Sequence, residues 1–324
     1  MTLLQVDGLT VRIGGAEVVG DVSFALERGE RLGLIGESGS GKSMTALALI
    51  GLLPEEASVE GRVVLDGDDL VAMSEGRRCD LRGDRIGMIF QEPMTALNPV
   101  MRVGNQVAEV VRRHRGGSRR STRERALELL RRVEFADPER IARAYPHELS
   151  GGQRQRVMVA MAIACSPALV LADEPTTALD VTVQAQVLEL LARLVAEEDA
   201  ALVLISHDLA VVSGMCDRLL VMYGGRIVES GPTDDVLERP RHPYTVGLLA
   251  TSTAMAEGGR RGRTLPTIRG SVPGLGRFPE GCVFRSRCER ATDRCRTMPP
   301  LEGAGHAFAC WHPVERPVTV GGAT

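Results

Sequence analysis

Residues 31–51, RLGLIGESGSGKSMTALALIG, decide the fold class of this 324-residue chain. The apolar run at residues 31–35 predicts a buried strand, and the apolar spacing after residue 42 predicts a helix. Between them, GESGSGKS at residues 36–43 matches the phosphate-loop pattern G-x-x-x-x-G-K-[ST], in the strand–loop–helix setting that this motif requires. Glycines let backbone N–H groups turn inward around phosphate oxygens, and the dipole of the following helix favours the anion. The stretch therefore predicts a site for nucleotide phosphates.

The single lysine of the chain lies inside this loop. Of the 39 basic residues, only Lys42 is a lysine, which indicates chemistry that needs a compact ammonium group rather than a planar guanidinium. We expect Lys42 to reach the β- and γ-phosphates of ATP, and Ser43 to offer its hydroxyl to Mg²⁺. The expected loop contacts with ATP are Gly36, Glu37, Ser38, Gly39, Ser40, Gly41, Lys42 and Ser43.

A second predicted strand ends in two carboxylates. Residues 169–175, LVLADEP, form an apolar run that ends in Asp173 and Glu174. In a protein with a phosphate loop, we expect Asp173 to hold Mg²⁺ through water and Glu174 to orient the attacking water.

Apolar runs alternate with helical patterns along the chain, which predicts an α/β fold with a parallel sheet and crossover helices around a P-loop NTPase core. We also expect an antiparallel β layer before residue 31 and a hairpin that turns at residues 224–225. The expected domains are an ATPase at residues 1–235, with a helical subdomain at about 98–166, and a small, loop-rich, cysteine-containing extension at 236–324.

The overall charge does not indicate a nucleic-acid partner, because the formal net charge is only −3. The arginine-rich residues 112–132 lack interleaved aromatics, and Glu124 and Glu128 are spaced to pair along a helix, so we expect a solvated helical face. The longest apolar stretch is broken at Ser166 and Pro167, whereas a membrane span needs about 20 apolar residues. We therefore expect neither a spanning helix nor a signal peptide, and a chain that resides in the cytosol.

Residues 149–157, LSGGQRQRV, resemble the signature motif of ABC-transporter ATPases. Ser150 is placed to cap a helix, and glycines at the first helical positions allow close backbone approach to an anion. The resemblance implies that this helix end binds the γ-phosphate held by a second subunit. The implied contacts across the dimer are Leu149, Ser150, Gly151, Gly152, Gln153 and Asp180.

Three further motifs occur in the order that this family shows. Gln91 in FQEP resembles the Q-loop glutamine, Asp180 in ALD resembles the D-loop aspartate, and His207 in LISHD resembles the switch histidine. The resemblance covers about residues 3–243 and implies an ABC ATPase fold.

The resemblance also implies a mechanism. Two subunits would pair head to tail, with each ATP between the phosphate loop of one and the signature helix of the other. The implied catalytic residues are Glu174, which positions or activates water, His207, which contacts the γ-phosphate, and Gln91. The implied Mg²⁺ ligands are Ser43, Gln91 and Asp173. Where the family usually stacks an aromatic residue on adenine, this chain has Ile13, so we expect an apolar contact there.

Two stretches resemble the branch of dipeptide and oligopeptide importers: FQEPMTALNP at residues 90–99 and RHPYTVGLLAT at residues 241–251. This implies a peripheral ATPase subunit at the cytoplasmic face of the cell membrane. The implied partners are a second ATPase, commonly a different chain although a homodimer stays open, two transmembrane permeases and, indirectly, an extracytoplasmic solute-binding protein. No nucleic-acid partner is expected.

Other functions remain open at this stage. Nickel importers are close relatives of the peptide branch, so nickel or another small solute is an alternative cargo. A soluble ABC protein acting on ribosomes or DNA is a further alternative, although the chain has one nucleotide unit and no inserted coiled coil. A regulatory or metal-sensing subunit, in which the extension is the functional part, is the third.

The extension holds four of the seven cysteines: Cys282, Cys288, Cys295 and Cys310. Their spacing, C-x5-C-x6-C-x14-C, has neither zinc knuckles nor a ferredoxin pattern, so spacing alone does not choose a metal. The resemblance adds that some peptide-importer ATPases carry an iron–sulfur cluster in this extension. We therefore expect a [4Fe–4S] cluster that acts as a structural staple, with zinc and unligated thiols as alternatives. His306 and His312 are alternative zinc ligands or packing residues.

Overall fold

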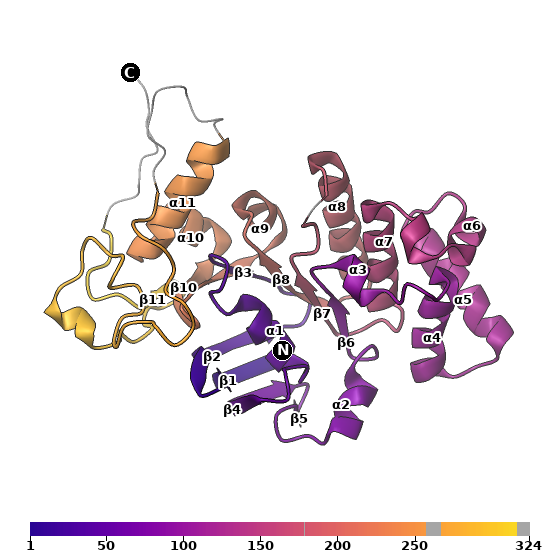
Figure 1. Cartoon of the computed structure of the whole chain (residues 1–324), viewed down its shortest axis with the longest axis horizontal. Helices are drawn as coiled ribbons and strands as arrows, with labels where there is room; N and C mark the ends of the chain where they lie inside the picture. Colours follow the sequence, from indigo (N-terminus) through magenta and orange to yellow (C-terminus); the bar gives the residue numbers. More distant parts are fainter. Residues whose placement is uncertain (178, 257–266, 316–324) are drawn as a thin grey trace. The chain divides into compact units, whose positions relative to one another are not determined.

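The computed structural model describes residues 1–177, 179–256 and 267–315, so part of the expected extension lies outside the described residues. The described chain forms two compact units, and Figure 1 labels their helices and strands. Unit 1 contains residues 1–4, 26–30 and 65–205, and unit 2 contains residues 5–25, 31–64 and the described residues from 206 onward. None of the described helices combines the length and apolar character needed to cross a membrane.

Unit 1 is built on three parallel strands that pair in the order β6-β7-β8. Their bounds are β6 (Ile86–Ile89), β7 (Leu169–Asp173) and β8 (Ala201–Ser206). Every residue of β7 and β8 is buried, as expected for parallel strands covered on both faces. The predicted parallel strand that ends at Asp173 is therefore confirmed.

Helices make up most of the rest of unit 1. They are α2 (Glu75–Leu81), α3 (Pro93–Ala96), α4 (Val103–Arg115), α5 (Arg119–Arg132), α6 (Pro138–Arg143), the short η1 (Pro146–Glu148), α7 (Gly151–Ala162) and α8 (Val181–Glu197), with a short strand β5 (Asp68–Asp69). Helices α4 to α7 pack against one another through buried side chains such as Val107, Leu129 and Val157. The arginine-rich face is solvated as predicted, because the side chains of the Arg120–Glu124 and Arg125–Glu128 pairs, both at 3.0 Å, are exposed.

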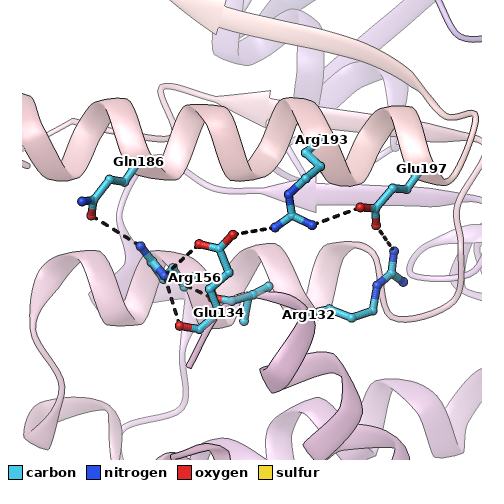
Figure 2. Close-up of polar contacts among 7 residues, drawn as sticks. Arg132, Glu134, Arg156, Gln186, Arg193 and Glu197 are labelled. Carbon is cyan, nitrogen blue, oxygen red and sulfur yellow. Dashed lines mark hydrogen bonds and ion pairs between the residues drawn. The ribbon is translucent and has the colours of Figure 1, made fainter. Parts of the chain in front are cut away.

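A chain of ion pairs joins α8 to the helical region, as Figure 2 shows. Glu134, which follows α5, accepts from Arg156 of α7 at 3.5 Å and from Arg193 of α8 at 2.8 Å. Arg193 also pairs with Glu197 at 3.0 Å, and Glu197 pairs with Arg132 at 3.0 Å. An exposed pair alone contributes less than about 1 kcal/mol, but shared partners restrain several side chains together. The network therefore links α7 and α8 within unit 1.

In unit 2, β3 (Arg31–Ile35) pairs in parallel with β9 (Arg218–Tyr223), which pairs antiparallel with β10 (Arg226–Pro232). The turn between β9 and β10 lies at residues 224–225, as predicted, and both glycines have positive φ, 57° and 79°. The short strand β11 (Ala307–Phe308) of the extension pairs antiparallel with β10.

A second layer contains β1 (Thr2–Ile13), β2 (Ala16–Glu27) and β4 (Ala57–Leu65), neighbours in the order β2-β1-β4. Residues 14–15 join β1 to β2, and both glycines have positive φ, 57° and 82°. Two left-handed residues form the tight turn of an antiparallel hairpin, so the predicted antiparallel layer is confirmed. The helices of unit 2 are α1 (Lys42–Leu49), α9 (Leu209–Met215), α10 (Thr233–Glu238), α11 (Pro243–Ala256) and the short η2 (Asp293–Arg296).

One buried carboxylate connects β10 to the extension. Glu229 of β10 is 0% exposed, and it accepts the backbone N–H groups of Arg241 at 2.6 Å and His242 at 2.9 Å, just before α11. Its Oε1 also lies 2.7 Å from Nε2 of His306, next to β11. His306 is therefore a packing residue, and Glu229 holds three chain segments together.

An aromatic cluster adds a second connection. The ring centroids of Tyr223 in β9 and Tyr244 in α11 lie 4.7 Å apart, and Phe284 of the extension lies 5.2 Å from Tyr223 and 5.5 Å from Tyr244. Each buried aromatic ring removes roughly 150–250 Å² from water, so this cluster stabilises the packing of α11 and Phe284, both in the extension, on β9.

Replacing Glu229 by Ala is expected to lower the free energy of unfolding by about 3 kcal/mol, because buried donors that lose their acceptor cost about 1–3 kcal/mol each. Urea unfolding followed by the emission of Trp311, the single tryptophan of the chain, measures this change. The exposed Glu238→Ala on α10 is the control and should stay within about 0.5 kcal/mol of the wild type. Equal effects of the two variants would contradict the role of Glu229.

Candidate functional site

The phosphate-loop residues lie between β3 and α1 in unit 2, in the order that the sequence predicts. Gly36, Gly39 and Gly41 have φ of 154°, 79° and 99°, values that residues other than glycine rarely adopt. Helix α1 begins at Lys42, so its first N–H groups, which have no partner within the helix, open toward the loop. The loop thus has the backbone form of an anion site.

Backbone from two other strands packs directly on this loop. A Cβ atom at Gly36 would lie 2.2 Å from the carbonyl oxygen of Met222 in β9, and one at Gly41 would lie 2.9 Å from the carbonyl oxygen of Val18 in β2. The N–H of Gly225 donates to the carbonyl of Ser40 at 3.0 Å. Glycine is therefore required at these positions for packing as well as for backbone conformation.

The polar side chains of the loop suit a phosphate ligand. Lys42 is 5% exposed, and its Nζ donates to the carbonyls of Gly36 at 2.8 Å and Glu37 at 3.0 Å. Ser40 is 1% exposed, and within the described chain its buried hydroxyl makes no hydrogen bond. A buried hydroxyl without a partner is costly unless a ligand pairs with it, so this residue fits a phosphate oxygen.

Glu174 follows β7 in unit 1 with its carboxylate held by two neighbours. Its Oε2 accepts from Nε2 of Gln91 at 3.1 Å and from Oγ1 of Thr177 at 2.9 Å. Its backbone has φ 44°, a conformation that is uncommon for a residue with a side chain and that is often found at functional sites. The structure thus brings together two of the predicted catalytic residues, Gln91 and Glu174. The contribution of Thr177 was missed from the sequence.

The residues predicted to hold Mg²⁺ have suitable donor chemistry. Asp173 is the last residue of β7 and is 6% exposed, and Gln91 follows β6 in the same unit. Ser43 lies in the first turn of α1 in unit 2. Carboxylate, amide and hydroxyl oxygens are the hard ligands that Mg²⁺ prefers.

The signature helix α7 begins with a capping box. The Ser150 hydroxyl accepts the N–H of Gln153 at 3.3 Å, and Oε1 of Gln153 accepts the N–H of Ser150 at 3.0 Å. The predicted cap is confirmed. This exchange leaves the N–H groups of Gly151 and Gly152 as the open donors of the first turn. The helix dipole also favours an anion at this end.

The two signature glycines also lie against the segment that leads into α8. A Cβ atom at Gly152 would lie 2.4 Å from Cγ1 of Val183, and one at Gly151 would lie 3.1 Å from Cδ2 of Leu179. Asp180, between those contacts, caps α8 by accepting the N–H of Val183 at 3.0 Å. Unit 1 therefore brings the predicted signature and D-loop residues side by side.

The other predicted site residues follow strands. His207 is exposed and comes directly after β8, and the next residue, Asp208, caps α9. Ile13 is half-buried and ends β1.

Two residues that hold the phosphate loop were missed from the sequence. Nη1 of Arg287 lies 2.5 Å from Oε2 of Glu37, and the N–H of Glu37 donates to the Tyr244 hydroxyl at 2.7 Å. Tyr244 lies in RHPYTVGLLAT, so the importer-branch stretch was the available signal for it. No local pattern points from Arg287 to a residue 250 positions earlier.

The four cysteines of the extension are neighbours. The N–H of Cys282 donates to the carbonyl of Cys295 at 2.9 Å. The pKa of Cys282 is raised to about 11, mainly by burial and with smaller contributions from the nearby thiols of Cys295 and Cys288. Burial likewise raises the pKa of Cys310 to about 11, with contributions from the other three thiols. Soft thiolates suit zinc or iron.

These thiols do not reach the arrangement of a metal site in the described structure. Across residues 1–177, 179–256 and 267–315, no group of three or more His, Cys, Asp or Glu side chains is placed to hold a metal ion. Cys165 and Cys216 are buried, as predicted for core residues, and Cys79 is exposed.

Comparison with known protein families gives two matches. Residues 19–177 match the ABC transporter family. Residues 228–295 match the family described as the oligopeptide/dipeptide transporter, C-terminal region.

Curated relatives match almost the whole chain. The probable D,D-dipeptide transport ATP-binding protein DdpD of Escherichia coli (strain K12) is 47% identical over 312 residues, which are 95% of this chain and 94% of that protein. The oligopeptide transport ATP-binding protein OppD of Salmonella typhimurium (strain LT2) is 46% identical over 319 residues, 97% of this chain and 94% of that protein.

Solved structures match 71–74% of the chain. The ATP-binding cassette MJ0796, a dimer in a post-hydrolysis state bound to ADP and Pi, is 30% identical with a TM-score of 0.63, covering 71% of this chain and 99% of that chain. CbiO1 of Clostridium perfringens, part of the transporter complex cbiONQ, is 26% identical with a TM-score of 0.64. The match covers 74% of this chain and 91% of that chain.

The contact of Gly152 with Val183 predicts the sign of a stability change. Glycine to alanine in a helix normally stabilises by up to about 1 kcal/mol. Gly152→Ala is instead expected to destabilise by about 1–3 kcal/mol, because the new methyl group overlaps the stiff Val183 side chain. The free energy of urea unfolding measures it. Gly151→Ala is the matched control and should be milder, because the flexible end of Leu179 can move. Adding Val183→Ala to Gly152→Ala should recover part of the loss, and a stabilised single variant would contradict the contact.

Proposed function

This chain belongs to the ABC transporter family of ATP-binding proteins, and on that premise we propose that it is the ATP-hydrolysing subunit of an importer for di- or oligopeptides. The observation that carries the substrate class is the match of residues 228–295 to the C-terminal region of oligopeptide and dipeptide transporters. Relatives named for oligopeptide and D,D-dipeptide transport extend over 95–97% of the chain, which supports the same class.

The phosphate loop would hold the ATP phosphates through backbone N–H groups, the Lys42 ammonium and the Ser40 hydroxyl. Lys42 is well suited because its Nζ already lies among loop carbonyls, where a phosphate oxygen would add a charged partner. Ile13 would contact the base by apolar packing. The signature residues of a second subunit would meet the γ-phosphate from the other side, through Ser150 and the open N–H groups of α7.

Glu174 would position and activate the attacking water. Gln91 and Thr177 both donate to its Oε2, so the carboxylate is fixed in direction before the water arrives. His207 would donate to the γ-phosphate and stabilise the charge that develops during bond breaking. Ser43, Gln91 and Asp173 would hold Mg²⁺, which would neutralise the negative charge that develops on the phosphates.

We also propose how the chain divides. Residues 1–235 form the ATPase, with a helical subdomain at about residues 98–166, and residues 236–324 form the extension. The two family matches, at residues 19–177 and 228–295, support this division.

The proposed setting is the cytoplasmic face of the membrane, where the chain is a peripheral subunit. It would pair with a second ATPase, either a different chain or a second copy, and with two transmembrane permeases. The extracytoplasmic solute-binding protein would deliver the peptide to the permeases without touching this chain. The dimeric state of MJ0796 and the place of CbiO1 in a transporter complex support such an assembly.

For the four cysteines we propose a [4Fe–4S] cluster that stabilises the extension, with zinc as the alternative. The thiols are close enough to raise one another's pKa, which supports the proposal, although the described side chains do not form a metal-binding group. A loop-rich segment with a small core is the kind of structure that a metal staple stabilises.

Glu174→Gln tests the hydrolytic role, because it keeps the side-chain size and removes the negative charge. ATP hydrolysis by the purified transporter is expected to fall by at least about 100-fold, while ATP binding by titration calorimetry is retained. Glu189→Gln, an exposed substitution on α8, is the control and should leave hydrolysis unchanged. Hydrolysis that survives Glu174→Gln would rule out this carboxylate as the base.

Anaerobic purification tests the proposed cluster. We expect about four iron atoms per chain and absorbance near 400 nm, and we expect Cys295→Ser to lower both. Cys79→Ser, at an exposed cysteine away from the extension, should change neither. Zinc without iron would replace the cluster by the zinc alternative. If the purified chain holds neither metal, the thiols are unligated and the proposed metal site is wrong.

A further inference from the structure

We propose that the C-terminal extension positions the phosphate loop, with Arg287 and Tyr244 as positioning residues that act through Glu37. The proposal rests on ATP being bound at the phosphate loop, and it concerns what holds that loop in its binding form.

Arg287 and Glu37 form a partly buried ion pair through two hydrogen bonds, in which the Glu37 side chain is 26% exposed. Nη1 of Arg287 lies 2.5 Å from Oε2 of Glu37, and Nη2 lies 3.2 Å from Oε1. Arg287 is 6% exposed. A guanidinium and a carboxylate joined by two parallel hydrogen bonds are fixed in direction as well as in distance.

The remaining donors of Arg287 are also engaged. Nε donates to the carbonyl of Arg269 at 2.9 Å, and Nη1 contacts the Tyr223 hydroxyl at 3.3 Å. The guanidinium carbon lies 5.7 Å from the centroid of the Tyr223 ring. Because these contacts come from β9 and from the described residues after 266, the position of Arg287 is set by the folded extension.

The backbone of Glu37 is held as well. Its N–H donates to the Tyr244 hydroxyl at 2.7 Å, and Tyr244 is 0% exposed in the aromatic cluster with Tyr223 and Phe284. Glu37 is therefore restrained by two parts of the extension, at its side chain by Arg287 and at its backbone by Tyr244 of α11.

These restraints act on the part of the loop that contacts Lys42. The Glu37 carbonyl accepts from Lys42 Nζ at 3.0 Å and from the N–H of Ser40 at 3.2 Å. If Glu37 moves, the direction of the ammonium and the start of the phosphate cradle move with it. A preformed loop avoids the free energy of ordering when ATP binds.

An ion pair that is partly or wholly buried contributes little net stability, because the loss of hydration offsets much of the attraction. Its directional effect on the loop is therefore the measurable consequence. The affected quantity is nucleotide affinity, and ATP and ADP should be affected alike, because both place a β-phosphate in the loop.

The experiment measures ATP and ADP binding to the full-length chain with Mg²⁺ by titration calorimetry. Arg287→Ala is expected to raise the Kd for both nucleotides about tenfold. Arg287→Lys keeps the charge but loses the two parallel guanidinium donors, so its Kd values should lie between those of Arg287→Ala and the wild type. Arg285→Ala, in the same turn of the extension, is the matched control and should bind as the wild type does. The double variant Arg287→Ala/Glu37→Ala should bind no more weakly than Arg287→Ala alone, because both residues act through one contact.

Trp311 emission reports whether the extension stays folded in each variant. If Arg287→Ala loses the folded extension, Tyr244→Phe decides the question, because it removes only the hydroxyl and keeps the packed ring. Tyr244→Phe is expected to raise the Kd for both ATP and ADP, while the Trp311 emission stays as in the wild type. An unchanged Kd in Tyr244→Phe and in folded Arg287→Ala would overturn the proposal, as would independent effects in the double variant. A wild-type chain that binds no ATP would instead contradict the proposed function.

Discussion

Direct contact between the phosphate loop and neighbouring backbone is the constraint on which the nucleotide site depends. A side chain at Gly36 would overlap the carbonyl of Met222, and one at Gly41 would approach the carbonyl of Val18. Because β9 and β2 approach the loop so closely, its N–H groups are held in one arrangement by strands distant in sequence. The cost is a loop that accepts only glycine at these positions.

Glycine also permits close packing at the signature helix. Gly152 brings α7 close to Val183, and Ser150 and Gln153 close the helix end by exchanging hydrogen bonds. Backbone N–H groups then remain the polar feature of the first turn. The ion pairs through Glu134 and Arg193 connect α7 and α8 further along their length (Figure 2). The signature helix and the segment that carries Asp180 are therefore packed together within unit 1.

The extension is bound to unit 2 by contacts of different physical kinds. Glu229 of β10 supplies a buried acceptor to two other segments, and Tyr223, Tyr244 and Phe284 supply apolar area. Arg287 adds the charged contact that reaches Glu37. The extension is thus part of the packing around the phosphate loop.

Local patterns in the sequence were sufficient for features that depend on neighbouring residues. The glycine spacing of the phosphate loop, the Ser150 cap, the strand ending at Asp173 and the turn at residues 224–225 were predicted because each is determined within a few positions. The peptide-importer branch was likewise evident from continuous stretches, and the relatives agree with it.

Only the tertiary structure decided which distant residues meet. The contacts of Arg287 with Glu37, His306 with Glu229 and Gly152 with Val183 join separate segments. In a chain whose basic residues are all arginine except Lys42, composition cannot indicate which guanidinium pairs with a given carboxylate. That choice depends on burial and on backbone positions set by the fold, and it placed part of the support for the phosphate loop in the extension.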